Sequence, residues 1–341
     1  MLYCRAGFEA ECAQEISASA GAHGVYGHVR AKRDDAYVEF VADGVREARL
    51  DASQPGLIFA RQCLAVFAQL DALPTTDRVT PILAALRESG ERYADVLVES
   101  PDTNEGKALA TFCKSFGNAL RGAMKSARLL DAAAPQRLHA FFPQGGKVYL
   151  CTDDVATSSP WPQGIPRLKF PREAPSRSTL KLDEAFLVLL GEDERARWLQ
   201  PGMSAVDLGA APGGWTWQLV RRGLHIVAVD NGPMDAALME SGQVAHARED
   251  GFRYRPKKPV DWLVCDMVEQ PRRVATLMAQ WFAEGRCRRA IFNLKLPMKK
   301  RWEETQLCLD IVRHALGSAA DVRARQLYHD REEITVFAQA R

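Results

Sequence analysis

The chain has 341 residues and a formal net charge of +2, and it is long enough for about two domains because single cores rarely exceed ~250–300 residues. Hydrophobic residues make up 47% and charged residues 26% of the sequence, as in soluble globular proteins, and no apolar run approaches the ~18 residues of a membrane span. The eight cysteines are scattered without a Cys-x-x-Cys motif, which argues against a zinc site and a disulfide framework.

The first half of the sequence alternates short strand patterns with amphipathic helices. A strand at 2–6, a helix at 8–20 and two short strands, of which 37–41 is the clearer, predict a β-α-β-β unit of the split βαβ type. Further along we expect, in chain order, a helix at 82–89, a strand at 94–98, a basic helical stretch at 107–130, and a hairpin of 137–142 and 147–152 turned by Gly145-Gly146.

Five prolines between positions 158 and 175 interrupt any periodicity, so we interpret this stretch as an interdomain linker. From 176 onward strands and helices alternate, which predicts an open parallel sheet with helices on both faces. A final hairpin would add one antiparallel strand, as in seven-stranded methyltransferases. The predicted elements are helix 180–190, strand 204–208, helix 215–222, strand 226–230, strand 244–248, strand 262–266, helix 274–283, strand 290–294, helix 302–316, and strands 322–328 and 333–338.

Charge is unevenly distributed along the first half of the chain. Residues 1–106 carry ten Lys and Arg against seventeen Asp and Glu, whereas residues 107–172 carry ten against three. This switch indicates a basic face that meets phosphates, although a merely solvated basic helix has the same composition. The side chains that suit backbone contacts, which position RNA without reading its sequence, are Lys107, Lys114, Arg121, Lys125 and Arg128.

A glycine-rich string from 207 to 214, Asp-Leu-Gly-Ala-Ala-Pro-Gly-Gly, follows a short apolar strand and opens a helix. Glycines let the backbone turn sharply and approach a ligand at the carboxyl edge of the sheet. The loop is neither a Gly-x-Gly-x-x-Gly motif nor a P-loop, and adenosylmethionine fits it because this cofactor has no phosphate to bind. Asp230, at the tip of the next strand, can accept hydrogen bonds from ribose hydroxyls, and Asp250 from an adenine amino group. A structural Gly-Pro turn, and a surface role for Asp250, are the alternatives.

Four charged residues lie at the ends of separate elements and can converge at this edge: Lys181, Asp266, Lys295 and Glu333. Methylation of a ribose requires a hydroxyl to attack a methyl group while losing a proton. A lysine takes that proton only when neutral, which requires a pKa below the ordinary ~10.4. Partial burial and a second ammonium lower a lysine pKa, whereas carboxylates oppose this and hold the ammoniums in position. We therefore expect Lys295 to be the general base, Lys181 and Glu333 to tune it, and Asp266 to position it, with no metal. Structural ion pairs are the alternative.

The string from Ser176 to Ala185, Ser-Arg-Ser-Thr-Leu-Lys-Leu-Asp-Glu-Ala, resembles the opening of the FtsJ-type RNA ribose methyltransferases. Further matching strings are Ala-Pro-Gly-Gly-Trp-Thr at 211–216, Val-Asp-Asn-Gly-Pro-Met at 229–234, Asn-Leu-Lys-Leu-Pro-Met at 293–298 and His-Asp-Arg-Glu-Glu at 329–333. The resemblance covers nearly the whole chain. It places the family's Lys-Asp-Lys-Glu tetrad on Lys181, Asp266, Lys295 and Glu333. Glu332 leaves a one-residue ambiguity, and we choose Glu333 because it directly precedes the alternating strand.

The resemblance implies a ferredoxin-like segment at 1–55, a THUMP-type RNA-binding domain at 56–157, a linker at 158–175 and a Rossmann-like methyltransferase domain at 176–341. It implies Lys295 as proton acceptor and S-adenosylmethionine as cofactor. The implied cofactor-binding residues are Ser178, Ala211, Pro212, Gly213, Gly214, Asp230, Asp250 and Asp266.

Within the family, the chain most resembles the bacterial members that methylate a cytidine ribose of 23S ribosomal RNA. This implies 23S RNA, free or in an early precursor, as the partner of a monomer. The N-terminus lacks the basic and apolar regions of a signal peptide, so we expect a cytoplasmic protein. The basic cluster Lys299-Lys300-Arg301 is predicted to contact substrate phosphates, with a helix-start role as the alternative.

Two other functions are compatible with parts of the sequence. A methyltransferase of a small metabolite or a protein would leave the basic N-terminal region unexplained. An RNA-binding protein with a vestigial cofactor fold would bind RNA without methyl transfer, and Lys295→Ala would then change nothing.

Overall fold

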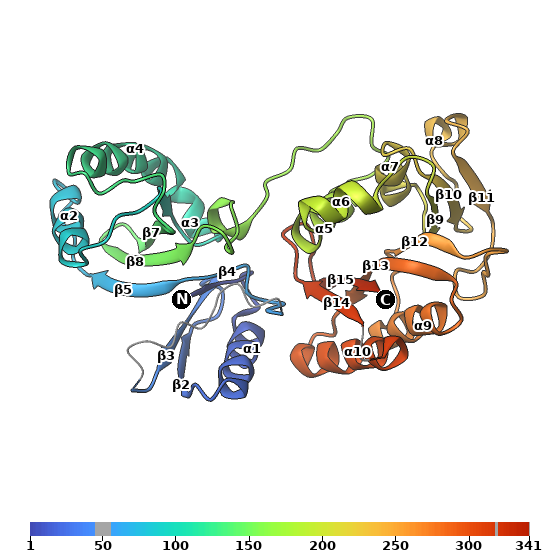
Figure 1. Ribbon diagram of the computed structural model, residues 1–341, viewed down its shortest axis with the longest axis horizontal. Coiled ribbons are helices and arrows are strands. Elements are labelled where there is room, and N and C mark those ends of the chain that lie inside the picture. Colours follow the sequence, from blue (N-terminus) through green and yellow to red (C-terminus); the bar gives the residue numbers. More distant parts are fainter. Residues whose placement is uncertain (45–55, 318–319, 341) are drawn as a thin grey trace. The chain divides into compact units, whose positions relative to one another are not determined.

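The structure is a computed structural model that describes residues 1–44, 56–317 and 320–340. The chain divides into two compact units, Met1–Pro166 and Arg167–Arg341, each with its own sheets and core (Figure 1). Within the described ranges, no helix combines the length and the apolar character needed to cross a membrane.

The first sheet of the N-terminal unit is small and antiparallel, with the strand order β2-β3-β1-β4. Helix α1 (Glu9–Ala22) packs against it because Cys12, Ile16 and Ala20, spaced four apart, form one buried face. The predicted β-α-β-β order is confirmed. The strands are β1 (Leu2–Tyr3), β2 (Gly27–Ala31), β3 (Tyr37–Ala42) and β4 (Gln62–Cys63).

The second sheet of this unit has the order β5-β8-β7-β6, with β6 and β7 parallel and the other pairs antiparallel. The predicted hairpin is confirmed as β7 and β8. The basic stretch predicted at 107–130 divides at Leu109 into two helices, and Cys113, Leu120 and Met124 of the longer one are buried. The elements are β5 (Ala65–Leu70), α2 (Val79–Glu88), β6 (Val96–Glu99), α3 (Asn104–Ala108), α4 (Ala110–Ser126), β7 (Gln136–Gln144) and β8 (Lys147–Asp154).

The proline-rich stretch begins against the N-terminal unit. A short 3₁₀ turn, η1 (Pro162–Gly164), places the Gln163 backbone N–H 2.5 Å from Glu99 Oε1 and the Gln163 side chain 2.5 Å from the Ser100 carbonyl. The boundary between the two units follows Pro166.

The C-terminal unit contains a seven-stranded sheet with the order β11-β10-β9-β12-β13-β15-β14, in which β15 runs antiparallel to both neighbours. This confirms the predicted α/β methyltransferase sheet with one antiparallel strand. The strands are β9 (Ser204–Leu208), β10 (His225–Val229), β11 (Val244–Ala247), β12 (Val260–Cys265), β13 (Cys287–Lys295), β14 (Asp321–Arg325) and β15 (Glu333–Gln339).

Helices cover both faces of this sheet, so its central strands are almost entirely buried (Figure 1). Phe186 and Trp215 pack from the helical layer onto Trp262 and Phe337 of the sheet. The order of the strands reverses between β9 and β12, and the carboxyl ends on either side of such a switch point form the ligand-binding crevice of doubly wound folds. The helices are α5 (Thr179–Leu189), α6 (Glu192–Trp198), α7 (Gly214–Val220), α8 (Ala236–Glu240), α9 (Pro271–Ala283) and α10 (Arg301–Leu316), of which α6 and α8 were not predicted.

Candidate active site

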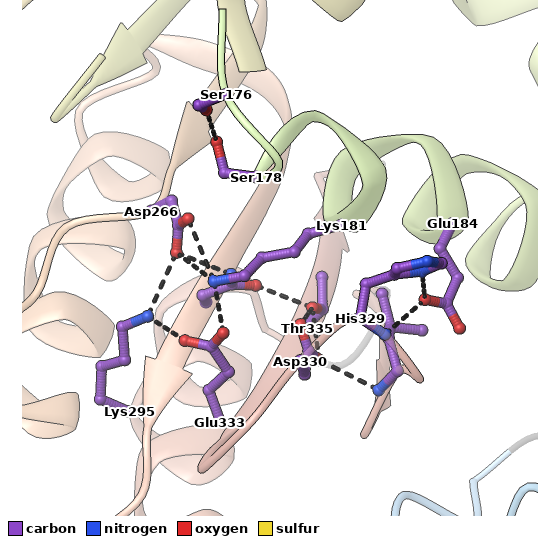
Figure 2. Close-up of polar contacts among 12 residues, drawn as sticks. Ser176, Ser178, Lys181, Glu184, Asp266, Lys295, His329, Asp330, Glu333 and Thr335 are labelled. Atoms are coloured by element: carbon purple, nitrogen blue, oxygen red, sulfur yellow. Dashed lines mark hydrogen bonds and ion pairs between the residues drawn. The ribbon is translucent and has the colours of Figure 1, made fainter. Parts of the chain in front are cut away.

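Four charged side chains from four elements meet at the carboxyl edge of the large sheet, and we call them the lysine–carboxylate cluster: Lys181, Asp266, Lys295 and Glu333 (Figure 2). Lys181 Nζ lies 3.3 Å from Asp266 Oδ2, and Lys295 Nζ lies 3.4 Å from Asp266 Oδ1. Both lysines also contact Glu333, one at each carboxylate oxygen. Each ammonium position is therefore fixed by both carboxylates.

The local elements explain this convergence. Lys295 is the last residue of β13 and Glu333 the first of β15, and the antiparallel register sets them opposite one another. Asp266 directly follows β12, the strand next to β13, and Lys181 projects from the first turn of α5. The structure therefore brings together all four residues that the sequence singled out.

Exposure differs within the cluster. The side chain of Lys295 is 26% exposed, those of Lys181 and Asp266 are 16% exposed, and that of Glu333 is 3% exposed. Burial lowers the pKa of Lys181, but the Asp266 and Glu333 carboxylates outweigh it, so the pKa is raised overall. Burial raises the pKa of Glu333, but Lys181 and Lys295 outweigh it and the pKa is lowered. Lys181 is thus a fixed positive charge behind the more accessible Lys295.

Glu332 and Glu333, between which the sequence left an ambiguity, have different environments. Glu332 is 63% exposed and pairs with Arg301 at 2.6 Å, at the start of α10. Only Glu333 of the two reaches the lysines in the described part of the chain. The alternating strand pattern was the signal that distinguished them.

Sequence reasoning missed a buried polar layer beneath the cluster. Asn293 Nδ2 donates to Asp266 Oδ1 at 2.8 Å, and Asn293 Oδ1 accepts from the Thr335 hydroxyl at 2.7 Å. Thr335 in turn contacts Asp330 (Figure 2). The sequence feature that could have indicated this layer is Asn293, an asparagine inside the apolar strand that ends at Lys295. A polar group inside an apolar strand needs a hydrogen-bond partner, which points to further polar side chains nearby.

The glycine loop connects β9 to α7, and we call its residues 209–214 the cradle. Gly213 has a φ of 117°, and a Cβ there would overlap Leu238. A Cβ on Gly214 would overlap the hydroxyls of Ser176 and Ser178, which are 2.7 Å apart. Glycine at these two positions therefore lets Leu238 and the two serine hydroxyls pack directly against the loop. Ala211 is half-buried and Pro212 is exposed on the same loop.

Asp230 follows β10 and faces this loop. Its carboxylate accepts from the Ala211 N–H at 3.0 Å and the Gly232 N–H at 2.7 Å, which ties the loop to the second strand. Each oxygen keeps further acceptor capacity for ribose hydroxyls. Asp250 is exposed after β11 and accepts from the Phe252 N–H at 2.9 Å. The cradle and these carboxylates suit a nucleoside cofactor without phosphate.

Asp207, at the end of β9, lies beneath the loop and was not predicted to matter. It is fully buried and accepts from the Thr216 hydroxyl at 2.7 Å. Burial raises the pKa of Asp207 to about 7, even though the Thr216 hydrogen bond opposes the shift. This bond joins the strand before the loop to the helix after it.

The predicted basic residues lie mostly on the surface. Lys107, Lys114, Lys125 and Arg128 are exposed, whereas Arg121 is held by Asp95 at 2.9 Å. At the other predicted cluster Lys299 and Lys300 are exposed just before α10, and Arg301 is the partner of Glu332. The exposed lysines leave their charge available to an anionic partner.

Three family models match successive parts of the chain. They are the RlmM ferredoxin-like domain at residues 1–64, the N-terminal part of ribosomal RNA large subunit methyltransferase M at 77–153, and the FtsJ-like methyltransferase at 174–296. The last match spans the glycine loop and three members of the lysine–carboxylate cluster.

Curated relatives match along the full length of the chain. The ribosomal RNA large subunit methyltransferase M of Xanthomonas oryzae pv. oryzae is 55% identical over 341 residues, and that of Xanthomonas axonopodis pv. citri is 54% identical over 341 residues. Each comparison covers 99% of this chain and 98% of the relative.

Proposed function

The chain belongs to the ribosomal RNA large subunit methyltransferase M family and is an S-adenosylmethionine-dependent methyltransferase, and we propose that it methylates the ribose 2'-hydroxyl of a cytidine in 23S ribosomal RNA. The observation that carries the proposal is the lysine–carboxylate cluster at the sheet edge beside the glycine loop. A ribose hydroxyl is a weak nucleophile whose proton needs an acceptor, and this cluster supplies an amine at that place.

The proton acceptor in this proposal is Lys295 Nζ. It is the more exposed of the two lysines and is held by Asp266 and Glu333. Lys181 stays protonated, because the Asp266 and Glu333 carboxylates raise its pKa. Lys295 therefore takes the 2'-hydroxyl proton as the oxygen attacks, and Asp266 keeps the amine directed toward that oxygen.

The cofactor contacts follow from the cradle. Bound S-adenosylmethionine supplies an electrophilic methyl group on a sulfonium. Ser178 and the backbone of 211–214 would hold its amino-acid end, Asp230 its ribose and Asp250 its adenine. Asp266 would line the same site from the lysine side. The packing of the loop supports this assignment, because the missing Cβ at Gly214 leaves the Ser178 hydroxyl directly against the loop backbone.

The RNA is held in this proposal by exposed lysines on both units. Lys114 and Lys125 of α4 serve phosphate contacts within a THUMP-type RNA-binding region, and Lys299 and Lys300 serve them beside the cluster. Such contacts position the RNA and leave the choice of nucleotide to groups nearer the site. The acting form is proposed to be a cytoplasmic monomer.

The test is transfer of a labelled methyl group from S-adenosylmethionine to unmodified 23S RNA, followed by mass spectrometry of the nucleosides. We expect 2'-O-methylcytidine as the product and loss of transfer in Lys295→Ala. A methyl group on a base, or transfer that does not depend on RNA, would overturn the proposal.

A further inference from the structure

Three buried polar side chains lie under the lysine–carboxylate cluster: Asn293 of β13, Thr335 of β15 and Asp330 in the loop before β15. Their exposed fractions are 0%, 0% and 1%. Asn293 precedes Lys295 by two residues and Thr335 follows Glu333 by two, and side chains alternate along strands. The same face of the sheet therefore carries the pair Asn293–Thr335 directly behind the pair Lys295–Glu333.

These side chains form a continuous series of polar contacts, of which the contact between Thr335 and Asp330 can be followed in Figure 2. Asn293 Nδ2 lies 2.8 Å from Asp266 Oδ1, and Asn293 Oδ1 lies 2.7 Å from Thr335 Oγ1. Thr335 Oγ1 lies 3.0 Å from Asp330 Oδ2 and 3.3 Å from Asp330 Oδ1. Asp330 Oδ2 also accepts from the Leu327 N–H at 3.0 Å. This series of contacts ends at Asp266, one of the two carboxylates that contact both lysines.

The number of available hydrogens determines which group donates and which accepts in each of these contacts. Asn293 has to turn its N–H toward the Asp266 carboxylate, so its carbonyl faces Thr335. A threonine hydroxyl has one hydrogen and cannot donate to both the Asn293 carbonyl and an ionised Asp330. A protonated Asp330 removes the conflict, because it donates to Thr335 through Oδ1 while Oδ2 accepts from Leu327.

The surroundings of Asp330 agree with a neutral acid. Burial raises the pKa of Asp330 well above its ordinary value, and the Glu333 and Glu184 carboxylates raise it further. The Leu327 N–H and the Lys181 ammonium oppose this shift but do not cancel it. Carboxylic acids in apolar surroundings stay protonated for the same reason.

We propose that Asp330, Thr335 and Asn293 form a positioning relay, in which a neutral carboxyl donates to the threonine, the threonine donates to the asparagine carbonyl, and the asparagine N–H holds Asp266 between the two lysines. The inference rests on the proposed function, because its readout is methyl transfer. None of the three residues touches the reacting atoms. They act through Asp266 on the placement of Lys295.

The distances explain why Asp266 needs this support. Its contacts with the lysines measure 3.3 to 3.4 Å, so the 2.8 Å bond from Asn293 is its shortest polar contact in the described part of the chain. Without that bond the carboxylate can rotate with its flexible ammonium partners. Misplacement of a catalytic group by about 1 Å costs on the order of 10²-fold in rate.

The experiment compares Thr335→Val with Thr335→Ser in the full-length protein. Single-turnover transfer to unmodified 23S RNA is measured together with the dissociation constant of S-adenosylmethionine and the melting temperature. The relay predicts a loss of about 10- to 100-fold in rate for Thr335→Val. It also predicts cofactor affinity within about 3-fold, and a rate within about 3-fold of wild type for Thr335→Ser.

Two further variants control the interpretation. Thr305→Val makes the same change at an equally buried threonine of α10, outside the site, and is expected to retain the wild-type rate. Asp330→Asn keeps a donor toward Thr335 and an acceptor toward Leu327, so this conservative change is expected to restore the relay where Asp330→Leu breaks it.

The outcomes distinguish a failure of the relay from a failure of the proposed function. A wild-type rate in Thr335→Val contradicts the relay, and so does a loss of rate matched by an equal loss of cofactor affinity. A rate in Asp330→Asn as low as in Thr335→Val contradicts the neutral donor. A wild-type protein that transfers no methyl group to RNA defeats the proposed function instead.

Discussion

Glu332 and Glu333 are adjacent in sequence but differ in environment. Glu332 is on the surface beside Arg301. Glu333 is between two lysines, with 3% of its side chain exposed. Removing the Glu333 carboxylate leaves Asp266 as the one carboxylate shared by the two lysines in the described part of the chain. Removing the Glu332 carboxylate releases a surface pair of little energetic weight.

The pair Glu333→Gln and Glu332→Gln tests this difference. We expect Glu333→Gln to lower the single-turnover rate by about 100-fold, because Lys181 and Lys295 lose one of the two carboxylates that fix their positions. Glu332→Gln should stay within about 3-fold of wild type. Equal effects of the two substitutions on the rate would show that the fourth cluster member was assigned wrongly.

At the scale of elements, the sequence predicted most of the large sheet because most of its strands are short apolar runs, and two of them, β12 and β13, end at or directly before a charged residue. Asp266 and Lys295 follow from that pattern, since a charge that ends a buried run has to lie at an edge. Strand β4 has two residues and α8 has five, which is too short for any periodicity to show. Such elements depend on tertiary pairing.

The buried polar layer could not be predicted for a different reason. Asn293, Thr335 and Asp330 are ordinary residues in sequence, and they become a unit only through the antiparallel register of β13 and β15. Arg121 is a residue for which the local sequence pattern suggested an available charge that the folded structure engages. It belongs to the basic stretch in sequence, but Asp95 and the Val96 carbonyl hold its guanidinium. Pairing partners from distant segments decide which charges stay available.

The proposed contribution of the exposed lysines to RNA binding can be tested by reversing their charge. The double change Lys114→Glu/Lys125→Glu should weaken RNA binding and reduce the salt dependence of log K by about 2, because each lost phosphate contact lowers the slope by about 1. Lys299→Glu/Lys300→Glu should act in the same direction. Lys32→Glu, at an 82% exposed lysine paired with Asp35, is the matched control. Binding measured from low to high salt checks this, and an unchanged slope in both double variants would exclude the predicted contacts.

At the scale of the molecule, a buried ion network joins the two N-terminal sheets. His139 lies 2.7 Å from Glu99 and 2.9 Å from Asp153. Tyr3 of the first sheet donates to Glu99, and Gln62 of the same sheet donates to Asp153. The two sheets therefore share one set of buried charges, in addition to the apolar contacts between them.

This network gives the N-terminal unit a pH-dependent stability. Burial lowers the pKa of His139, but Glu99 and Asp153 outweigh it and raise the pKa to about 9. Because the pKa of His139 is higher in the folded than in the unfolded protein, protonation of His139 stabilises the fold. This stabilisation is complete below the unfolded pKa of ~6.5 and is lost as the pH rises through the folded pKa. The free energy of unfolding should therefore fall between about pH 6.5 and 9.

His139→Gln should remove this pH dependence and destabilise the unit by about 3–5 kcal/mol, because the buried Glu99 carboxylate loses the cation that it contacts, whereas Asp153 keeps Arg137. Denaturant unfolding at several pH values measures both effects. His28→Gln, at a half-exposed histidine of β2, should leave the curve unchanged. A wild-type free energy that does not vary between pH 6.5 and 9 would contradict a charged His139.

The most direct measurement for the whole account is the single-turnover rate of methyl transfer to 23S RNA by wild type, Lys295→Ala and Lys295→Arg, with cofactor affinity measured in parallel. An arginine keeps the positive charge but cannot give up its proton. We expect both variants to bind S-adenosylmethionine normally and to lose about 10²- to 10⁴-fold in rate. A rate in Lys295→Arg near that of wild type would show that position 295 supplies charge alone and that another group accepts the ribose proton.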